Sequence, residues 1–404
     1  MSSNTLPTAT RGSQTSESTP TLTNPLLWLM AVAAGVGIAN IYYNQPLLDQ
    51  IRVTFGVDSQ TVGWIPTLTQ FGYALGMLFL VPLGDMLQRK HLVVLFSTLT
   101  GLGSLAIAAA PNLHILAILS FVYGLCIMTP QLLVPFAAHL APAEQKGRVV
   151  GFMVSGILLG ILLARTVAGF VGAAFGWRAM FMLAGVIMTV LAILLAKALP
   201  RTEPTYNGHY IGLLATVWQL LREQPVLREA CLFGSMLFGS FMVFWSSLIH
   251  LMEDPSFGLG PRAVGLYGLL GAAAALLSPV IGNLADRTNP RRLTGLMIGL
   301  AISSYLIFYF GRTSLIMIGI GVLIMDVGVQ LGHVTNQGRI FKLVPTAQSR
   351  IQTAYMFCYF SGAAVGSAFG AWAWSAYQWA GVCAAAVLML LIASVKWLMP
   401  APRG

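Results

Sequence analysis

The sequence predicts an all-α integral membrane protein, because it carries few charges and its apolar residues form long, uninterrupted runs. Of the 404 residues, 57% are hydrophobic and 8% are charged, and the mean hydropathy is +0.78. An average soluble domain carries about 25% charged residues. A helix of about 20 apolar residues crosses a ~30 Å hydrocarbon layer with its backbone polar groups paired internally. A transmembrane β-barrel would show short alternating strands instead, and runs such as 92–110 do not alternate.

Twelve apolar segments are long enough to be membrane-spanning helices. They cover residues 26–45, 60–83, 92–110, 114–137, 148–172, 176–199, 228–250, 262–285, 292–311, 314–336, 351–372 and 376–398. Residues 1–24 are rich in Ser and Thr, so we expect a disordered cytoplasmic tail there rather than a signal peptide. The four cysteines lie in apolar segments without CxxC spacing, which predicts neither a metal site nor a disulfide.

The basic residues predict the orientation of the chain. With the N-terminus inside, 17 of the 22 Lys and Arg fall in inside segments, four fall outside and Arg165 lies within a span. Cytoplasmic loops carry such an excess, so we expect both termini in the cytoplasm and the protein in the cell inner (plasma) membrane. The net charge of +10 therefore reflects topology, and nucleic acid is not an expected partner.

A repeat divides the chain into two halves around a polar segment at 200–227. Asp85 corresponds to Asp286 with a shift of 201, and Arg148 corresponds to Arg350 with a shift of 202. Further landmarks keep nearly the same offset, namely Gly160, Ala164, Ala168 and Trp177 with Gly362, Gly366, Gly370 and Trp379. The repeat predicts two pseudo-symmetric six-helix bundles at 25–199 and 228–400, joined by a central cytoplasmic loop at 200–227.

One loop motif, which both halves carry, is typical of a known protein family. Residues 282–292 read GNLADRTNPRR and resemble the loop signature of the major facilitator transporters; the first half keeps a partial copy at 83–90. An Asp at a helix end beside cations can hold the inside face closed, and the alternative is a turn with positive-inside charges. The candidate gating residues are Asp85, Arg89, Lys90, Asp286, Arg287, Arg291 and Arg292.

The fifth span also resembles a motif of the drug and metabolite exporters in this family. The small residues Gly156, Gly160, Ala164 and Ala168 recur every four positions, a stripe that lets another helix approach closely. Such a smooth contact is what two sliding halves need. The resemblance implies the major facilitator fold, with a substrate site near the midplane between halves that rock against each other.

Two charges lie within spans, and each is expensive there unless it faces protein, water or a partner. Arg165 is in the fifth span and Asp326 is in the tenth. We hypothesise that they pair; separate partners in a hydrated cavity are the alternative. Asp326, Gln330, His333 and Gln337 lie at i, i+4, i+7 and i+11, on one helix face. That polar face favours a water-filled path for protons or, alternatively, hydrogen bonds to a substrate.

The remaining candidates come from the family resemblance, which places the first, fourth, seventh and tenth spans around the cavity. Asn40, Tyr43 and Asn44 are then cavity residues, together with Gln131 and Trp245. An interfacial aromatic belt is the alternative for Tyr42 and Tyr43. Pro130 and Pro135 flank Gln131 and predict a bent fourth span.

The resemblance implies a secondary active transporter that moves a small solute by alternating access, with proton-coupled efflux of a drug-like or metabolite substrate. An uptake carrier or an uncoupled facilitator is the alternative. We expect a monomer in the lipid bilayer, no metal and no cofactor besides a proton gradient. An enzyme is disfavoured, because the sequence lacks a paired nucleophile and base and a GxxxxGK[ST] loop. A transporter-like sensor is a more distant possibility.

Overall fold

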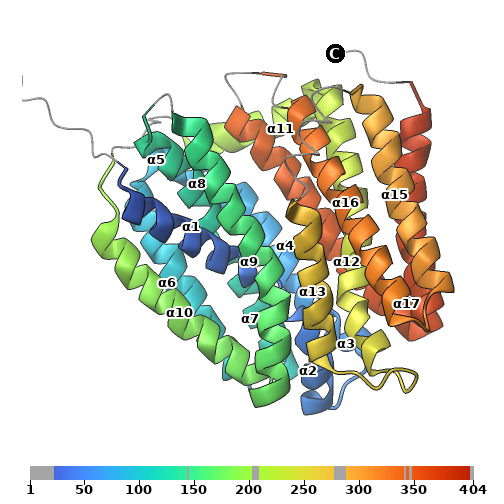
Figure 1. The fold of residues 1–404 in the computed structure, drawn as a ribbon. Coiled ribbons are helices and arrows are strands. Elements are labelled where there is room, and N and C mark those ends of the chain that lie inside the picture. The colour runs from blue at the N-terminus through green and yellow to red at the C-terminus, as the bar shows by residue number, and fades with distance from the viewer. Residues whose placement is uncertain are drawn as a thin grey trace, which may run out of the picture.

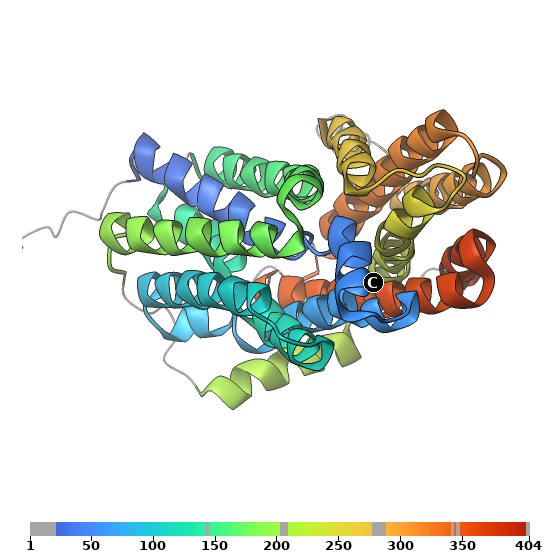
Figure 2. The ribbon, with the colours of Figure 1, turned by 90° about the horizontal axis from the view of Figure 1, so that it is seen from below.

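The computed structural model describes residues 22–142, 145–202, 209–276, 288–340, 343–344 and 348–400. Within these ranges the chain forms helices and no strands, so the predicted all-α fold class is confirmed. Figure 1 shows long helices running roughly alongside one another. Seen from below, the blue-to-green helices lie mainly to the left and the yellow-to-red helices mainly to the right (Figure 2). The predicted tail at 1–24 lies almost wholly outside the described residues.

The first half of the chain runs from α1 to α10. Its helices are α1 (Asn24–Ala39), η1 (Gln45–Leu47), α2 (Leu48–Phe55), α3 (Ser59–Val62), α4 (Trp64–Phe79), α5 (Leu83–Met86), α6 (Arg89–Ala108), α7 (Leu113–Cys126), α8 (Thr129–Leu140), α9 (Lys146–Phe175) and α10 (Trp177–Ala198). Helix α7 ends at Cys126, and Ile127 has a non-helical ψ of 50°. The chain thus turns just before Pro130, which confirms the predicted bend in the fourth span.

The second half follows the linking helix α11 (Tyr210–Glu223). Its helices are α12 (Pro225–Glu253), α13 (Pro261–Leu276), α15 (Pro290–Phe310), α16 (Leu315–Ile340) and α17 (Gln348–Leu398). Helix α17 consists of two helices that meet at a kink, where Tyr377 and Gln378 leave the helical region and Gln378 has a φ of 52°. The kink separates the two predicted spans at 351–372 and 376–398.

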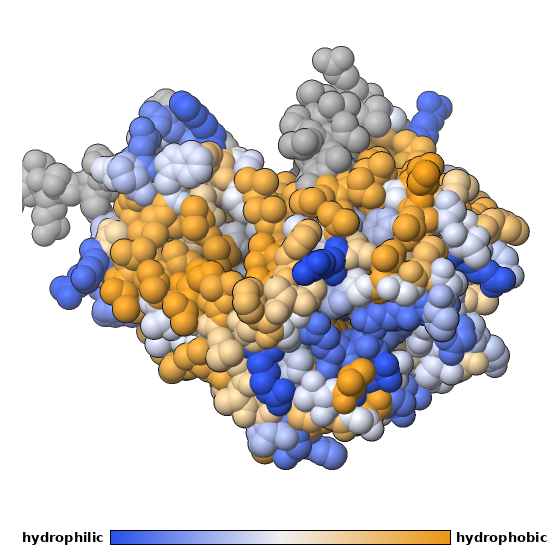
Figure 3. Space-filling model, turned by 60° about the horizontal axis from the view of Figure 1, so that its bottom comes forward, coloured by the Kyte–Doolittle hydropathy of each residue, from blue (hydrophilic) through white to orange (hydrophobic). Residues whose placement is uncertain are grey.

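The helices have the length and composition of membrane spans. Eight helical segments of the described chain are long and apolar enough to cross a bilayer, and α1 is a shorter apolar helix. A described helix overlaps each of the twelve predicted segments, and residues 277–285 of the eighth segment lie outside the described residues. Hydrophilic side chains gather over the end of the molecule that comes forward in Figure 3, and apolar ones over its flanks. This distribution is that of a multi-pass membrane protein.

Side-chain caps mark the first turn of several helices. Asp58 accepts a hydrogen bond from the backbone N–H of Thr61 and begins α3, and this hydrogen bond lowers the pKa of Asp58. Asn112 caps α7 through the N–H of Ile115 in the same way. These caps satisfy backbone donors that a helix start leaves unpaired.

Glycine contacts hold each half together. A Cβ added at Gly160 of α9 would lie 2.0 Å from the carbonyl oxygen of Gly35 in α1. A Cβ added at Gly366 of α17 would lie 2.1 Å from the carbonyl oxygen of Gly239 in α12. The same close contact therefore recurs between the first and fifth spans of each half. This corrects the expectation that the stripe serves sliding halves, because Gly156 and Gly160 pack within the first half.

The two halves touch at one end of the molecule, which we name the contact end and define by Gly169 near the end of α9 and Pro261 at the start of α13. A Cβ added at Gly169 would lie 2.5 Å from the Pro261 carbonyl oxygen. A Cβ added at Gly63, just before α4, would lie 2.1 Å from Cβ of Ala371 in α17. Helix pairs α9–α13 and α4–α17 therefore close this end.

The opposite end, where α9 and α17 begin, contains a pocket between the halves, and we name it the pocket end. The first half lines the pocket with residues of α5, α6 and α8, including Arg89, Gln131 and Pro135. Val217 of α11 lines it as well, and the second half contributes Arg350 and Thr353. Tyr210 of α11 donates a hydrogen bond to the Phe79 carbonyl of the first half.

Candidate functional site

Arg165 lies deep in α9 with its guanidinium among aromatic rings, and the side chain is 2% exposed. Its Cζ lies 4.1 Å from the centroid of Trp245, 4.8 Å from that of Tyr42 and 5.7 Å from that of Phe241. Such cation–π contacts stabilise a buried cation. The Tyr42 ring comes from the first half, and the other two rings come from α12 in the second.

One hydrogen bond also fixes Arg165. Its Nε donates to Oε1 of Gln45 at 2.8 Å, and the Gln45 amide in turn lies 3.3 Å from the Met242 sulfur of α12. The Nη2 atom of Arg165 is buried and has no hydrogen-bond partner among the described residues. Part of the guanidinium is therefore free to bind another acceptor.

Asp326 of α16 is the second intramembrane charge. Its Oδ2 is buried without a hydrogen-bond partner among the described residues. Asp326 and Arg165 interact electrostatically, but no direct ion pair joins them in the described part of the chain. The hypothesised Arg165–Asp326 ion pair is therefore not formed in this conformation, in which Arg165 binds Gln45 and Oδ2 of Asp326 has no partner among the described residues.

Helix α13 passes beside both charges at two glycines. A Cβ added at Gly268 would lie 3.1 Å from Cβ of Arg165, and one added at Gly271 would lie 3.2 Å from Oδ2 of Asp326. Side chains at these two positions would occupy the space next to the charges. Because both distances are shorter than ordinary van der Waals contact, the glycines let α13 pack closely against Arg165 and Asp326.

The predicted polar face of α16 exists and is half-buried. Asp326, Gln330, His333 and Gln337 all keep part of their surface exposed, whereas the neighbouring Asn336 is buried. Nε2 of His333 lies 3.0 Å from Nε2 of Gln337. These four residues form a half-buried polar stripe along the helix.

Aromatic rings of α17 stand beside this stripe. The His333 ring lies 5.0 Å from Tyr359 and 5.9 Å from Tyr355. Phe238 of α12 stacks on Tyr359 at 4.0 Å, and Phe238 also lies 5.6 Å from Phe241. A continuous aromatic wall therefore runs from His333 toward the rings around Arg165.

The polar residues at the end of α1 are held within the first half. Oδ1 of Asn40 accepts a hydrogen bond from the Tyr123 hydroxyl, and its Nδ2 donates to the Val36 carbonyl at 2.7 Å. Asn44 donates to Thr69 at 3.3 Å. Tyr42 and Tyr43 are only 2% and 6% exposed. The alternative of an interfacial aromatic belt is therefore wrong for these two tyrosines.

Gln131 and Trp245 are the two remaining predicted cavity residues. Gln131 of α8 donates to the Tyr73 hydroxyl at 2.9 Å and lines the pocket between the halves. Trp245 is buried under the Arg165 guanidinium, and its Nε1 has no hydrogen-bond partner among the described residues. Both residues therefore lie where the halves meet.

Two glutamines at this junction were missed as site residues. Gln45 binds Arg165, and Gln70 of α4 accepts a hydrogen bond from Ser367 of α17 at 3.2 Å, across the halves. Both are fully buried. A buried amide in a membrane helix needs a partner, and that signal was present in the sequence.

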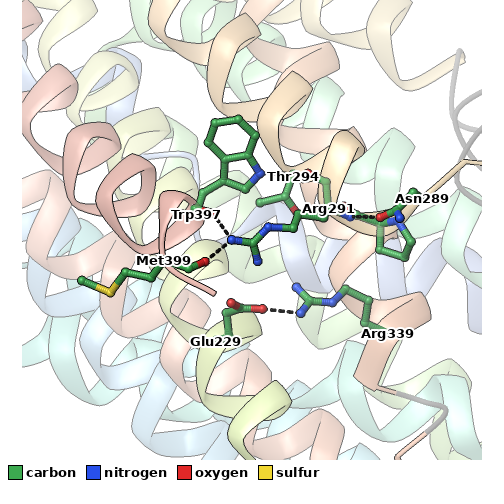
Figure 4. A network of polar contacts seen from close by, with 8 residues as sticks. Glu229, Asn289, Arg291, Thr294, Arg339, Trp397 and Met399 are labelled. Atoms are coloured by element: carbon green, nitrogen blue, oxygen red, sulfur yellow. Dashed lines mark hydrogen bonds and ion pairs between the residues drawn. The ribbon is translucent and has the colours of Figure 1, made fainter. Parts of the chain in front are cut away.

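The pocket end holds a charge network within the second half (Figure 4). Arg291 donates from its guanidinium to the carbonyl oxygens of Trp397 and Met399, at the end of α17. Arg339 of α16 forms an ion pair with Glu229 of α12, whose side chain is 2% exposed. The sequence indicated neither pairing, because Glu229 and Arg339 are 110 residues apart.

The predicted gating residues lie in different environments. Arg89 donates to the Gly84 carbonyl at 3.1 Å and lines the pocket. Lys90 is half-buried and Arg292 is exposed. Asp286 and Arg287 lie outside the described residues, as does the side chain of Asp85. Arg291 joins α15 to the end of α17, so in this conformation it links two helices of one half.

Two helical halves that meet around buried polar groups, with a pocket at one end, define a membrane transport protein. Residues 27–367 match the Major Facilitator Superfamily, and the chain belongs to this family. The protein is therefore a membrane transporter of the major facilitator type.

Three known proteins illustrate the similarity. The transporter YgaY of Escherichia coli (strain K12) is 39% identical over 376 residues, which cover 93% of this chain and 95% of YgaY. A probable sugar efflux transporter of Helicobacter pylori (strain ATCC 700392 / 26695) is 24% identical, covering 80% and 82% of the two chains. A bacterial homologue of the lysosomal transporter Spinster, solved inward-facing and occupied, aligns with a TM-score of 0.74 at 14% identity, covering 92% and 95%.

Proposed function

We propose that this transporter exports a small solute in exchange for protons, by alternating access. The observation that carries the proposal is the pair of buried charges at the junction of the halves. Arg165 belongs to the first half and Asp326 to the second, and they interact electrostatically without a direct ion pair. A relative movement of the halves changes the environment of both charges together.

The shape of the molecule supports alternating access. With both termini in the cytoplasm, as the basic residues predict, the contact end faces outward and the pocket end faces the cytoplasm. The structure then corresponds to a conformation that is closed outside and accessible from inside. A transport cycle requires the α9–α13 and α4–α17 contacts to open while the pocket end closes.

Asp326 is the proposed proton carrier. It is a carboxylate on the half-buried polar face of α16, and it can alternate between a protonated form and an ionised form that interacts with Arg165. The substrate binds nearby, where aromatic walls and a balanced pair of charges suit a net-neutral or amphipathic molecule. Outward direction draws support from the Helicobacter pylori relative, which is named a sugar efflux transporter.

Proton movement in reconstituted vesicles tests the proposal. A pH-sensitive dye inside the vesicles reports protons when a panel of sugars and amphipathic compounds is added, for the parent protein and for Asp326→Asn. The parent is expected to exchange protons for at least one compound, and Asp326→Asn is expected to lose at least 90% of that signal. Asp58→Asn, in an exposed cap outside the spans, serves as the matched control and keeps the signal.

The same measurement separates the competing functions. Solute movement without any proton signal in the parent would make the protein an uncoupled facilitator. Coupling that survives in Asp326→Asn but disappears in His333→Asn would move the proton site to the histidine of the same stripe.

A further inference from the structure

Two opposite charges at the junction of the halves each present an atom without a partner. Nη2 of Arg165 and Oδ2 of Asp326 are both buried and make no hydrogen bond to any described residue. Oε1 of Glu229 is likewise without a partner, but its Oε2 forms an ion pair with Arg339, whereas neither Arg165 nor Asp326 forms an ion pair in the described part of the chain. A buried charge is stable only when its polar atoms are satisfied. The two free atoms therefore point to a ligand that satisfies both.

The two charges are close enough for one small molecule to reach both. Gly268 and Gly271 are three residues apart on α13, so their Cβ positions are roughly 5–6 Å apart. Arg165 Cβ lies 3.1 Å from the first of these positions, and Asp326 Oδ2 lies 3.2 Å from the second. Together these distances place the Asp326 carboxylate within about 12 Å of Arg165 Cβ. The long Arg side chain covers part of that interval.

The charge balance of the site selects the ligand. One guanidinium and one carboxylate sum to zero, so a ligand with net charge would leave one of them uncompensated in an apolar surrounding. A neutral hydroxyl compound would satisfy the hydrogen bonds but not the separated charges. A molecule with one anionic and one cationic group satisfies both, since charge-assisted hydrogen bonds are the stronger kind.

We propose that the site between Arg165 and Asp326 binds a small zwitterion of the amino-acid type. Its carboxylate accepts hydrogen bonds from the Arg165 guanidinium, and its ammonium group donates to Asp326. The apolar part of the ligand packs on the aromatic wall of Phe238 and Tyr359 beside the stripe. The proposal rests on the proposed function, because it names the substrate class for the same site.

The assignment also gives a physical reason for coupling. The substrate's ammonium group and a proton both bind the carboxylate of Asp326, so the two compete for one site. Occupation by one excludes the other, and this is the condition that exchange requires. Gln45 and the rings of Trp245 and Tyr42 act as positioning residues that hold the Arg165 guanidinium.

Ligand charge variants test the proposal on the whole protein purified in detergent. The probes are leucine and phenylalanine, their amides, which lack the carboxylate, and their N-acetyl forms, which lack the ammonium group. Glucose is the neutral probe. Calorimetric titration of the parent protein is expected to show at least tenfold tighter binding of one zwitterion than of its amide, its N-acetyl form or glucose.

Two substitutions assign the contacts individually. Arg165→Gln is expected to abolish the advantage of the zwitterion over the amide, and Asp326→Asn is expected to abolish its advantage over the N-acetyl form. Each result is a ratio within one variant, so a general loss of affinity does not imitate it. If either variant fails to fold, Arg165→Lys and Asp326→Glu keep the charges and are expected to retain the zwitterion preference.

Several outcomes would overturn the proposal that the ligand is a zwitterion. They are equal binding of the three charge forms to the parent, tighter binding of glucose, and no binding of either amino acid. The titration needs no proton gradient, so its failure is distinct from failure of the coupling proposal. A zwitterion preference without proton exchange in vesicles would refute the coupling and leave the substrate class standing.

Discussion

A charge in the interior of this protein is stable only with a partner, and the partners differ by position. Arg165 relies on three aromatic rings and one amide, whereas Arg339 relies on a carboxylate. Arg291 uses the carbonyl oxygens that end α17, where the helix dipole favours a cation. The same residue type is thus stabilised in three different ways.

The Glu229–Arg339 pair gives a prediction at the residue scale. Glu229→Gln leaves Arg339 without its counter-charge, and breaking a buried pair from one side destabilises by about 3 kcal/mol. We expect a clearly lower midpoint of thermal unfolding in detergent. The double variant Glu229→Met/Arg339→Met removes both charges and is expected to recover most of the loss.

The control for this pair is Arg292→Gln, because Arg292 is exposed. Its free energy of unfolding should stay within about 0.5 kcal/mol of that of the parent protein. Equal losses in the single and double variants would show that the uncompensated charge of Arg339 is not what destabilises Glu229→Gln.

At the scale of helices, glycine decides which faces meet. The α1–α9 contact brings the Gly35 backbone against Gly160, and the α12–α17 contact brings the Gly239 backbone against Gly366. Backbones approach this closely only when neither position carries a side chain, and close packing drives helix association in lipid. Repetition of this contact in both halves is the structural counterpart of the sequence repeat.

The substitution Gly160→Ala tests the close contact between α1 and α9. Its methyl group would lie 2.0 Å from the Gly35 carbonyl oxygen. Because both atoms are fixed by the backbone, no change of side-chain conformation can relieve this clash. The helices must separate, and overpacking of this kind costs about 1–3 kcal/mol. Gly151→Ala, in the same helix with no atom within 4 Å, is the matched control.

The expected sign differs between the two glycine variants. Alanine is a better helix former than glycine by up to about 1 kcal/mol, so Gly151→Ala should keep or raise the unfolding midpoint while Gly160→Ala lowers it. Unchanged stability of Gly160→Ala would mean that the two backbones do not approach as closely as described.

For the whole molecule, the important feature is where the described contacts between the halves lie. Gly63, Gln70 and Gly169 contact the other half near the contact end or toward the middle, while residues of both halves line a pocket at the pocket end. Helix α11 connects the halves and adds a hydrogen bond to the first half. This asymmetry is what a two-state rocking movement needs.

A cross-link at the contact end tests the movement. Ser375 of α17 donates to Gln60 of α3 at 3.4 Å, across the halves. In a protein whose four native cysteines are replaced by serine, Gln60→Cys/Ser375→Cys is expected to form a disulfide on oxidation. Transport in vesicles should fall to background and return after reduction, because the contact end can no longer open.

The single variants Gln60→Cys and Ser375→Cys control for oxidation itself and should transport in both redox states. Full transport by the cross-linked double variant would contradict the movement, since the contact end would then stay closed throughout the cycle.

The sequence by itself determined the membrane helices, the repeat and the polar stripe of α16. Each is a one-dimensional property, because transfer into lipid is summed residue by residue and a stripe follows from helical periodicity. The positions of Arg165 and Asp326 as buried charges followed in the same way. Even the break before Pro130 depends on local backbone chemistry.

Only the tertiary structure decided which groups meet. Arg165 binds Gln45, 120 residues away, and does not form a direct ion pair with Asp326. Arg291 reaches carbonyl oxygens more than 100 residues further along the chain. Partner choice depends on ångström-scale distances between helices, which result from packing of many side chains at once. A sequence pattern therefore indicates that a buried charge needs a partner, but the packing of the helices determines which residue that partner is.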